Sequence, residues 1–254
     1  MTMTKRIDAS FYSNIYSNID RGDIKSVSEL EAGTSPALAL NYSRLLPEDK
    51  SAVILDIGCG WGYFLNYLKK KGYYNIEGID LLHHAKRLDF IRKNITSNIT
   101  GADNIEDHLA KNSNKYDLIV LQQVIYYFRK EDLPKIMEAI FASLKPGGRL
   151  VVETFNGSLL TSTFVQNWDY ERKMIFTEYS LAEILVDSGF TLKELSGLKL
   201  PRDMRPKAVI RRFAQSAWLC VLRLIYMLER GTDAALVPHI FDKHIIAVAQ
   251  KEAR

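Results

Sequence analysis

Apolar positions in this chain change between short continuous runs and stretches with helical periodicity, beginning at about residue 52. A continuous apolar run predicts a strand buried on both faces, whereas apolar residues three or four positions apart predict an amphipathic helix. Strands are predicted over 52–57, 75–79, 98–100, 116–122, 149–154, 190–195 and 244–249, and helices over 63–71, 83–93, 104–111, 133–144 and 180–189. This alternation is typical of βαβ units, so we expect an α/β fold with a mostly parallel sheet and helices on both faces.

Turn and cap residues set the expected boundaries. Gly72 and Gly189 follow helical stretches as terminators, and Lys145-Pro146-Gly147-Gly148 is expected to separate a helix from the fifth strand. Ser180 and Glu183 have the spacing of a capping box, so we expect Ser180 to cap the helix that follows.

Two further helices are predicted outside this alternation. Aromatic and apolar residues recur at helical spacing between Phe11 and Ile19, so we divide the chain into a helical cap over 1–44 and a main domain over 45–254. An insertion at about 199–242 contains an amphipathic helix over 209–230. Arginines within that helix make a membrane-spanning role too costly.

The apolar face of the 209–230 helix must be covered by something. It could pack on the protein's own sheet or form a homodimer, or it could lie on a membrane surface. In the membrane interpretation, basic side chains meet anionic headgroups: Arg202, Arg205, Lys207, Arg211 and Arg212.

Composition narrows the functional classes. The 254 residues are 47% hydrophobic and 25% charged, with a formal charge of +4 that is not gathered into runs, so no nucleic-acid partner is expected. Cys59 and Cys220 show no disulfide pattern. No apolar run follows Lys5 and Arg6, so a secretory signal is not expected. We therefore expect a cytoplasmic protein, peripheral to a membrane if the 209–230 helix binds one.

A glycine-rich turn follows the first predicted strand, in Asp56-Ile57-Gly58-Cys59-Gly60-Trp61-Gly62. A dinucleotide fold prefers a small residue at position 63, which is Tyr63 here, so a pyrophosphate ligand and a nicotinamide oxidoreductase are disfavoured. A ligand without phosphates fits better, with an ammonium group for Asp56 to pair with, and S-adenosylmethionine has these properties.

Carboxylates at the ends of the second and third strands complete the predicted cofactor site. Asp80 is placed to accept hydrogen bonds from ribose hydroxyls, and Asp103 from an adenine amino group while Asn104 donates. The predicted cofactor-binding residues are Asp56, Gly58, Gly60, Asp80, Leu81, Asp103, Asn104 and Gln122.

These motifs together resemble the class I S-adenosylmethionine-dependent methyltransferases. The glycine-rich turn is similar to that family's first motif, Gly78-Ile79-Asp80 to its second, 116–122 to its fourth and 144–150 to its fifth. The resemblance implies a Rossmann-like sheet of seven strands whose last strand is antiparallel and inserts beside the fifth. The segment 176–178 and the helical insertion are similar to methyltransferases of bacterial surface-glycan synthesis.

The methyl acceptor should lie over the ends of the fourth and fifth strands. The expected substrate contacts are Tyr12, Tyr16, Gln123, Tyr126, Asn156 and Trp168. Many relatives carry an Asp-Val-Ile-Glu-His-like string after strand four, whereas residues 123–127 here contain neither acid nor histidine. Either a base lies elsewhere, with Tyr127 and His239 as candidates, or the acceptor oxygen is already ionised.

The sequence therefore predicts methyl transfer to an oxygen of a sugar, a glycan or another small molecule. Two alternatives stay open: methylation of an ionised carboxylate or phosphate oxygen, and a non-catalytic scaffold that retains the cofactor fold. No cluster of His, Cys or carboxylate residues has metal-ligand spacing, so no metal is expected.

Overall fold

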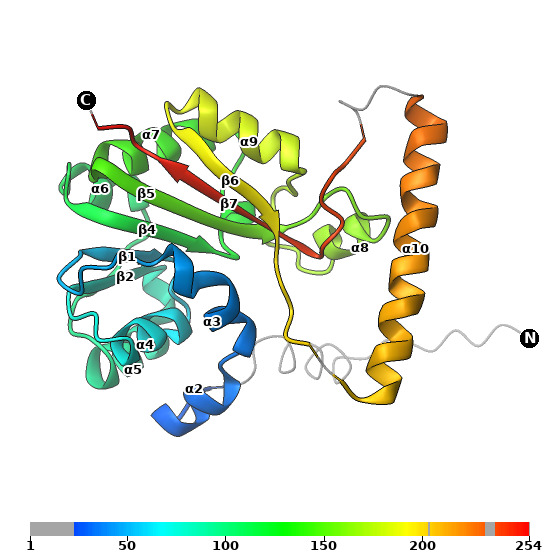
Figure 1. Cartoon of the computed structure of the whole chain (residues 1–254). Coiled ribbons are helices and arrows are strands. Elements are labelled where there is room, and N and C mark those ends of the chain that lie inside the picture. Colours follow the sequence, from blue (N-terminus) through cyan, green and yellow to red (C-terminus); the bar gives the residue numbers. More distant parts are fainter. Residues whose placement is uncertain (1–22, 203, 232–236, 254) are drawn as a thin grey trace, which may run out of the picture.

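In the computed structural model, which describes residues 23–202, 204–231 and 237–253, seven strands form one sheet in the order β3-β2-β1-β4-β5-β7-β6 (Figure 1). The strands are β1 (Ile54–Ile57), β2 (Ile76–Asp80), β3 (Ile99–Gly101), β4 (Tyr116–Gln122), β5 (Leu144–Phe155), β6 (Thr191–Gly197) and β7 (His244–Gln250). Pairings among β1 to β5 are parallel, whereas β7 runs antiparallel to both β5 and β6. The expected topology, with the last strand inserted beside the fifth, is confirmed.

Helices cover both faces of the sheet. They are α2 (Val27–Gly33), α3 (Pro36–Tyr42), α4 (Tyr63–Lys70), α5 (Ala85–Asn94), α6 (Ile105–Ala110), α7 (Leu133–Ser143), α8 (Ser162–Asn167), α9 (Glu178–Asp187) and α10 (Pro206–Arg230), with short 3-10 turns η1 (Ser43–Leu45), η2 (Leu82–His84) and η3 (Ile125–Tyr127). In Figure 1, α3, α4 and α5 lie below the sheet and α6, α7 and α9 above it, while α10 stands beside the sheet.

Alternating strand residues divide the core into two layers. Leu118 and Val120 of β4 pack with α3, α4 and α5, whereas Ile119 and Leu121 pack with α6, α7 and α9. All four are fully buried, as period-two side-chain alternation in a covered sheet requires. The sheet is thereby fixed on both faces, and its carboxyl edge is free to carry the functional residues.

Two local expectations were wrong. The capping box of α9 is formed by Thr177 and Ser180: Thr177 is the N-cap and Ser180 lies three residues inside, so the helix begins at Glu178. The segment 145–148 does not separate helix from strand, because β5 begins at Leu144 and includes it. A register shift opposite Tyr116 and Leu118 accommodates these residues, and Gly147 takes a positive φ of 79°.

The predicted N-terminal cap is described only from residue 23 onward. There α2 and α3, which hydrophobic periodicity did not predict, are capped by Ser26 and Ser35, whose side chains accept hydrogen bonds from Glu29 N and Ala37 N. The proposed helix over Phe11–Ile19 lies outside the described residues, and the boundary near residue 44 stays a prediction.

Candidate functional site

The glycine-rich turn holds its shape by backbone hydrogen bonds to β2. Gly58 N donates to Ile79 O at 2.8 Å, and Gly62 N donates to Cys59 O at 2.8 Å. Gly58 has φ 73°, and a Cβ there would lie 2.5 Å from Val124 Cγ2, so no side chain fits. A Cβ on Gly60, by contrast, would meet nothing within 4 Å. The turn is thus tightly packed at Gly58 and open at Gly60, where a ligand could approach the backbone.

Asp80 lies at the end of β2, directly against this turn. Its carboxylate accepts hydrogen bonds from Gly60 N at 2.6 Å and from Leu81 N at 2.7 Å. His84 Nδ1 lies 2.8 Å from Asp80 Oδ1, and the Asp80 side chain is only 8% exposed. The carboxylate therefore connects the open part of the turn to η2, in a position that suits recognition of ribose hydroxyls.

Asp56 is a buried carboxylate of β1 beside the turn. Burial raises its pKa well above the usual range, and the nearby charge of Asp80 raises it further. None of the hydrogen bonds within the described residues ends on the Asp56 carboxylate. A cationic ligand would relieve both effects, so this position fits the ammonium or sulfonium group of S-adenosylmethionine.

The remaining predicted cofactor residues lie on neighbouring strand ends. Leu81 is exposed after β2, and Asp103 is exposed after β3. Asn104 caps α6, since its Oδ1 accepts hydrogen bonds from the backbone of Glu106 at 2.9 Å and of Asp107 at 3.4 Å. Its side-chain oxygen is therefore engaged locally, which leaves its amide nitrogen for a ligand.

A second polar cluster, which sequence reasoning missed, surrounds Glu153 of β5. The carboxylate is buried and accepts hydrogen bonds from Tyr42 Oη at 2.7 Å, Gln122 Nε2 at 3.2 Å and Gln123 Nε2 at 2.7 Å. His244 Nδ1 lies 3.1 Å from Glu153 Oε1. Burial alone would raise the pKa of Glu153, but the hydrogen bonds from His244, Tyr42 and Gln123 hold it below the usual value.

The antiparallel direction of β7 brings His244 to this place. His244 is opposite Phe155 in the ladder between β5 and β7, at the edge where β4 and β5 end. Its ring packs edge-on against Phe155, with centroids 4.9 Å apart, and is partly exposed. With Nδ1 held by Glu153, the other ring nitrogen is the one available to an acceptor, as in carboxylate–imidazole pairs that remove protons.

The predicted substrate residues near β4 are close to this cluster, but their polar groups are largely engaged. Tyr127 Oη donates to Asp169 Oδ2 at 2.8 Å. Burial and Asp169 raise the pKa of Tyr127, so even less of the phenolate is available as a base at neutral pH. Tyr126 is buried against Tyr127 and Phe155. Gln123, at φ 58°, supports Glu153.

Asn156 and His239 anchor the segment that precedes β7. Asn156 Nδ2 donates to Ile240 O at 2.8 Å and to Asp242 O at 2.9 Å. The carboxylate of Glu178 accepts His239 N at 2.9 Å and Ile240 N at 2.7 Å, and His239 Nδ1 lies 3.1 Å from it. These contacts give both residues a structural task. The His239 side chain is 71% exposed.

Trp168 follows α8 and packs edge-on against Phe164, with both rings exposed. Near it, Arg172 lies over the Tyr126 and Phe155 rings, at 5.1 and 4.5 Å from their centroids. Arg172 therefore places a positive charge beside the predicted acceptor region. The substrate candidates Tyr12 and Tyr16 lie outside the described residues.

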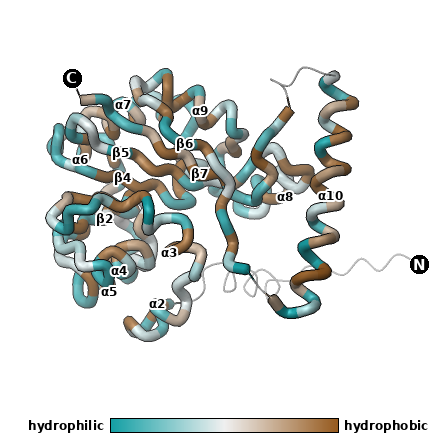
Figure 2. Tube along the Cα trace, in the orientation of Figure 1, coloured by the Kyte–Doolittle hydropathy of each residue, from teal (hydrophilic) through white to brown (hydrophobic). Residues whose placement is uncertain are grey.

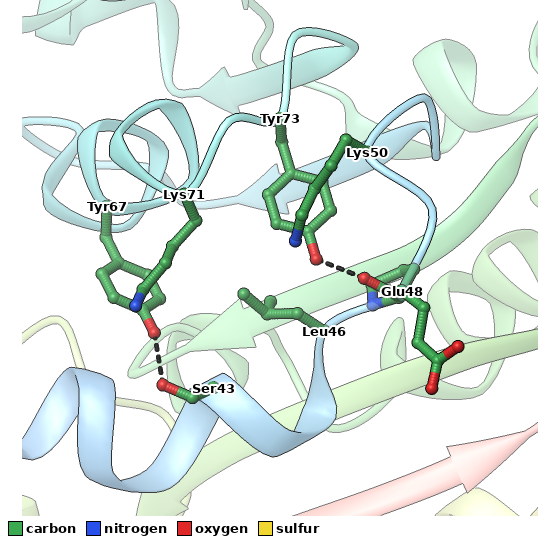
Figure 3. Close-up of a pocket in the computed structure, with 8 residues that line it drawn as sticks. Ser43, Leu46, Glu48, Lys50, Tyr67, Lys71 and Tyr73 are labelled. Atoms are coloured by element: carbon green, nitrogen blue, oxygen red, sulfur yellow. Dashed lines mark hydrogen bonds between the residues drawn. The ribbon is translucent and has the colours of Figure 1, made fainter.

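A pocket of about 310 Å³ occurs elsewhere, between η1 and the end of α4 (Figure 3). Its lining includes Ser43, Tyr67 and Tyr73, and Tyr67 Oη lies 2.7 Å from Ser43 Oγ. These residues lie at the amino end of β1, opposite the glycine-rich turn and Asp80. The pocket is therefore separate from the candidate site.

Comparison with known proteins agrees with this geometry. Residues 31–195, more than half of the chain, match the protein family described as "Methyltransferase domain". A ubiquinone biosynthesis O-methyltransferase of Xylella fastidiosa is 26% identical over 216 residues, covering 75% of this chain and 86% of that protein.

Other similarities are shorter or concern the fold. The mitochondrial arginine-hydroxylase NDUFAF5 of Mus musculus is 36% identical over 106 residues, covering 42% of this chain and only 29% of that protein. A SAM dependent methyltransferase from Archaeoglobus fulgidus has a TM-score of 0.61 at 18% identity, over 94% of this chain and all of that chain.

Proposed function

Because the chain belongs to the methyltransferase domain family and its cofactor is S-adenosylmethionine, we propose that it methylates a hydroxyl oxygen of a sugar, a glycan or another small molecule. The observation that carries the choice of a hydroxyl is the Glu153–His244 pair at the carboxyl edge of the sheet. The name of the Xylella relative, an O-methyltransferase, supports the same choice.

The cofactor half of the site consists of residues on β1, β2 and β3. When bound, S-adenosylmethionine supplies an electrophilic methyl group on a sulfonium. Asp56 would hold its positive charge, Asp80 its ribose hydroxyls, and the open backbone at Gly60 would lie against it. Asp103 and Leu81, exposed at the adjacent strand ends, would flank the adenine.

The acceptor half has to orient a hydroxyl group and remove its proton. In the tautomer with its proton on Nδ1, His244 donates to Glu153, which fixes the ring and leaves Nε2 to take the proton from the acceptor oxygen. Burial excludes water from the carboxylate, and Tyr42, Gln122 and Gln123 keep it in place. The oxygen then has the lone pair that an in-line displacement requires.

Arg172 favours a second candidate, in which the acceptor oxygen is an ionised carboxylate or phosphate. Its guanidinium is largely buried, and its Nε makes no hydrogen bond within the described residues but lies 3.9 Å from Asp169 Oδ2. An anionic acceptor group could take the place of Asp169 beside this cation, and it would need no base. The two candidates differ in whether the rate depends on His244.

Titration calorimetry with S-adenosylmethionine, S-adenosylhomocysteine and NAD comes first, and we expect binding of the two adenosyl ligands alone. Transfer of a labelled methyl group is then measured on acceptors that carry hydroxyl, carboxylate or phosphate groups. Product mass separates an added methyl group from the added oxygen that a hydroxylase would leave. No adenosyl binding would contradict the assigned cofactor.

The pH dependence then decides between the two candidates. For a hydroxyl acceptor, which needs a free base, kcat/KM falls at acidic pH, and the His244→Gln variant loses both the rate and the acidic limb. A rate that is flat from weakly acidic to neutral pH, and unchanged by His244→Gln, would favour the ionised acceptor. His108→Gln is the matched control, because the His108 ring lies by Tyr116 at the start of β4, away from both halves of the site.

A further inference from the structure

Helix α10 exposes its large apolar side chains to solvent. Within the helix, all of which is described, only Ala208 and Leu222 are buried. The exposed apolar residues include Ile210, Phe213, Trp218, Val221, Leu224 and Leu228, and Phe213 and Leu228 are 73% and 76% exposed. Figure 2 shows this hydrophobic character along a helix that stands beside the sheet. A face of this size is unusual on a surface without a binding role.

The contacts of α10 with the rest of the protein are made by its other side. Tyr226 Oη donates to Ser158 O at 2.6 Å, and the Tyr226 and Phe241 rings lie 6.1 Å apart. The guanidinium of Arg223 lies 5.3 Å from the Phe241 ring. At 3.6 residues per turn, Tyr226 and the buried Leu222 share a side, roughly opposite Leu224. Apolar side chains of α10 therefore also face outward, on the side that the rest of the described protein does not cover.

The same region concentrates positive charge. Residues 199–230 contain eight Lys or Arg and two acidic residues, a formal +6, whereas the whole chain carries only +4. The remaining residues therefore carry a net −2. Lys207 and Arg212 lie on either side of the outward face, each about 110° around the helix from its centre. Lys207 is exposed and Arg212 is half-exposed. Cations beside an apolar face complement a partner that has an apolar interior and negatively charged groups at its surface.

A second copy of the chain is a weaker match to this face. A two-helix seam uses a narrow apolar stripe with opposite charges beside it. Here the apolar residues occupy about half of the circumference of α10, and its only acidic residue is Glu229. Two such helices would bring like charges together.

We propose that α10 binds the surface of a membrane that contains anionic lipids. The helix lies parallel to the surface, with Phe213 and Leu224 among the acyl chains and Lys207 and Arg212 at the headgroups. Within the described residues, no helix is long and apolar enough to cross a membrane. Since α10 contacts Ser158 and Phe241, on the segments that flank β5 and β7, binding would hold the Glu153–His244 edge close to the lipid.

Co-sedimentation of the full chain with lipid vesicles tests this proposal. We expect binding to vesicles of phosphatidylcholine with phosphatidylglycerol at low salt, weaker binding at high salt, and little binding to phosphatidylcholine alone. Phe213→Ser with Leu224→Ser should reduce the partition coefficient about tenfold or more. The matched control, Tyr74→Ser with Val186→Ser, removes exposed apolar side chains elsewhere and should leave it unchanged.

A second pair of variants tests the charges. Lys207→Gln with Arg212→Gln should weaken binding about fivefold per cation. Lys130→Gln with Lys135→Gln removes the same charge from exposed positions outside α10 and should have no effect. Adenosyl-ligand affinity and circular dichroism show that each variant is folded.

Cys220 gives an independent measure of depth, because it is exposed on α10 while Cys59 is buried. A nitroxide at Cys220 should become protected from aqueous relaxation agents when anionic vesicles are added. The proposal is overturned if the full chain does not bind these vesicles at low salt. It is also overturned if the chain is a dimer that Phe213→Ser with Leu224→Ser dissociates, since α10 would then be an interface between copies.

Discussion

Replacing Glu153 by Gln tests the polar cluster with little change in shape. The amide oxygen of the introduced glutamine would still accept hydrogen bonds from Tyr42 and Gln122. Its NH₂ group would take the place of the other carboxylate oxygen and face Gln123 and His244. Gln123 can turn its amide over, because its Oε1 is buried without a partner within the described residues. His244 can accept at Nδ1 if its proton moves to Nε2.

The expected cost in stability follows from these changes in hydrogen bonding. In Glu153→Gln, hydrogen bonds to a charged carboxylate are replaced by hydrogen bonds between neutral groups. We therefore expect the free energy of unfolding to fall by about 1 kcal/mol and Tm by about 2–4 °C. Glu153→Ala instead leaves the buried Tyr42 hydroxyl and the other donors unpaired, which should cost about 3–5 kcal/mol. Thermal unfolding of both variants measures the difference.

The expected effect on the rate is much larger, because the proton on His244 Nε2 prevents that atom from acting as a base. We expect kcat/KM of Glu153→Gln to fall by about 10²–10⁴ with adenosyl-ligand affinity unchanged. The double variant with His244→Gln should be no slower than the slower single variant, because the two residues act as a unit. Wild-type activity in Glu153→Gln would refute the assignment of the base.

The pKa of Glu153 gives the same substitution a pH signature. A carboxyl group whose pKa is lowered on folding stabilises the fold at pH values above its pKa in the unfolded chain, which is about 4.3. That contribution is lost as the pH falls through the pKa of the folded state. The wild-type protein should therefore lose this contribution in acid, whereas Glu153→Gln should not.

Three further predictions concern the cofactor half of the site. Asp80→Ala should weaken S-adenosylmethionine binding at least several-fold in titration calorimetry, and unchanged affinity would contradict its role at the ribose. Asp56→Asn should raise the Tm of the cofactor-free protein but weaken cofactor binding. Because the pKa of Asp56 is raised on folding, the free energy of unfolding of the wild-type protein should increase as the pH falls toward that pKa. Asp56→Asn should not show this increase. Gly58→Ala should destabilise the fold by about 1–3 kcal/mol, because the added methyl group clashes with Val124. Gly60→Ala should destabilise it by only about 1 kcal/mol and mainly weaken cofactor binding. Equal Tm values for the two variants would contradict this distinction.

The strands and the glycine-rich turn could be predicted because their signals are local. Ile119 and its neighbours in β4 form a continuous apolar run, and such a run is needed where helices cover both faces of a sheet. The position of Asp80 beside Gly60 follows from the parallel pairing of β1 with β2. Each inference needed only one strand and the turn after it.

The Glu153–His244 pair could not be found in this way, because 91 positions separate the two residues. Their contact depends on the register that places His244 opposite Phe155, and nothing local in the sequence encodes that register. The one local feature that could have indicated the pair is Glu153 itself, an acidic residue within the apolar run of β5. Similarly, Tyr42 lies on a helix that periodicity did not reveal.

The position of β7 between β5 and β6 has a consequence for how the protein folds. Strands β1 to β4 and the glycine-rich turn come from one contiguous stretch of chain, 54–122, so the cofactor half can assemble from nearby segments. In contrast, β6 cannot join the sheet until β7 has paired, although α10 and its flanking segments separate them in sequence. Contacts between such distant segments form slowly. We therefore expect an intermediate that binds the cofactor before Glu153 and His244 have met, so that catalytic competence is the last property gained on folding.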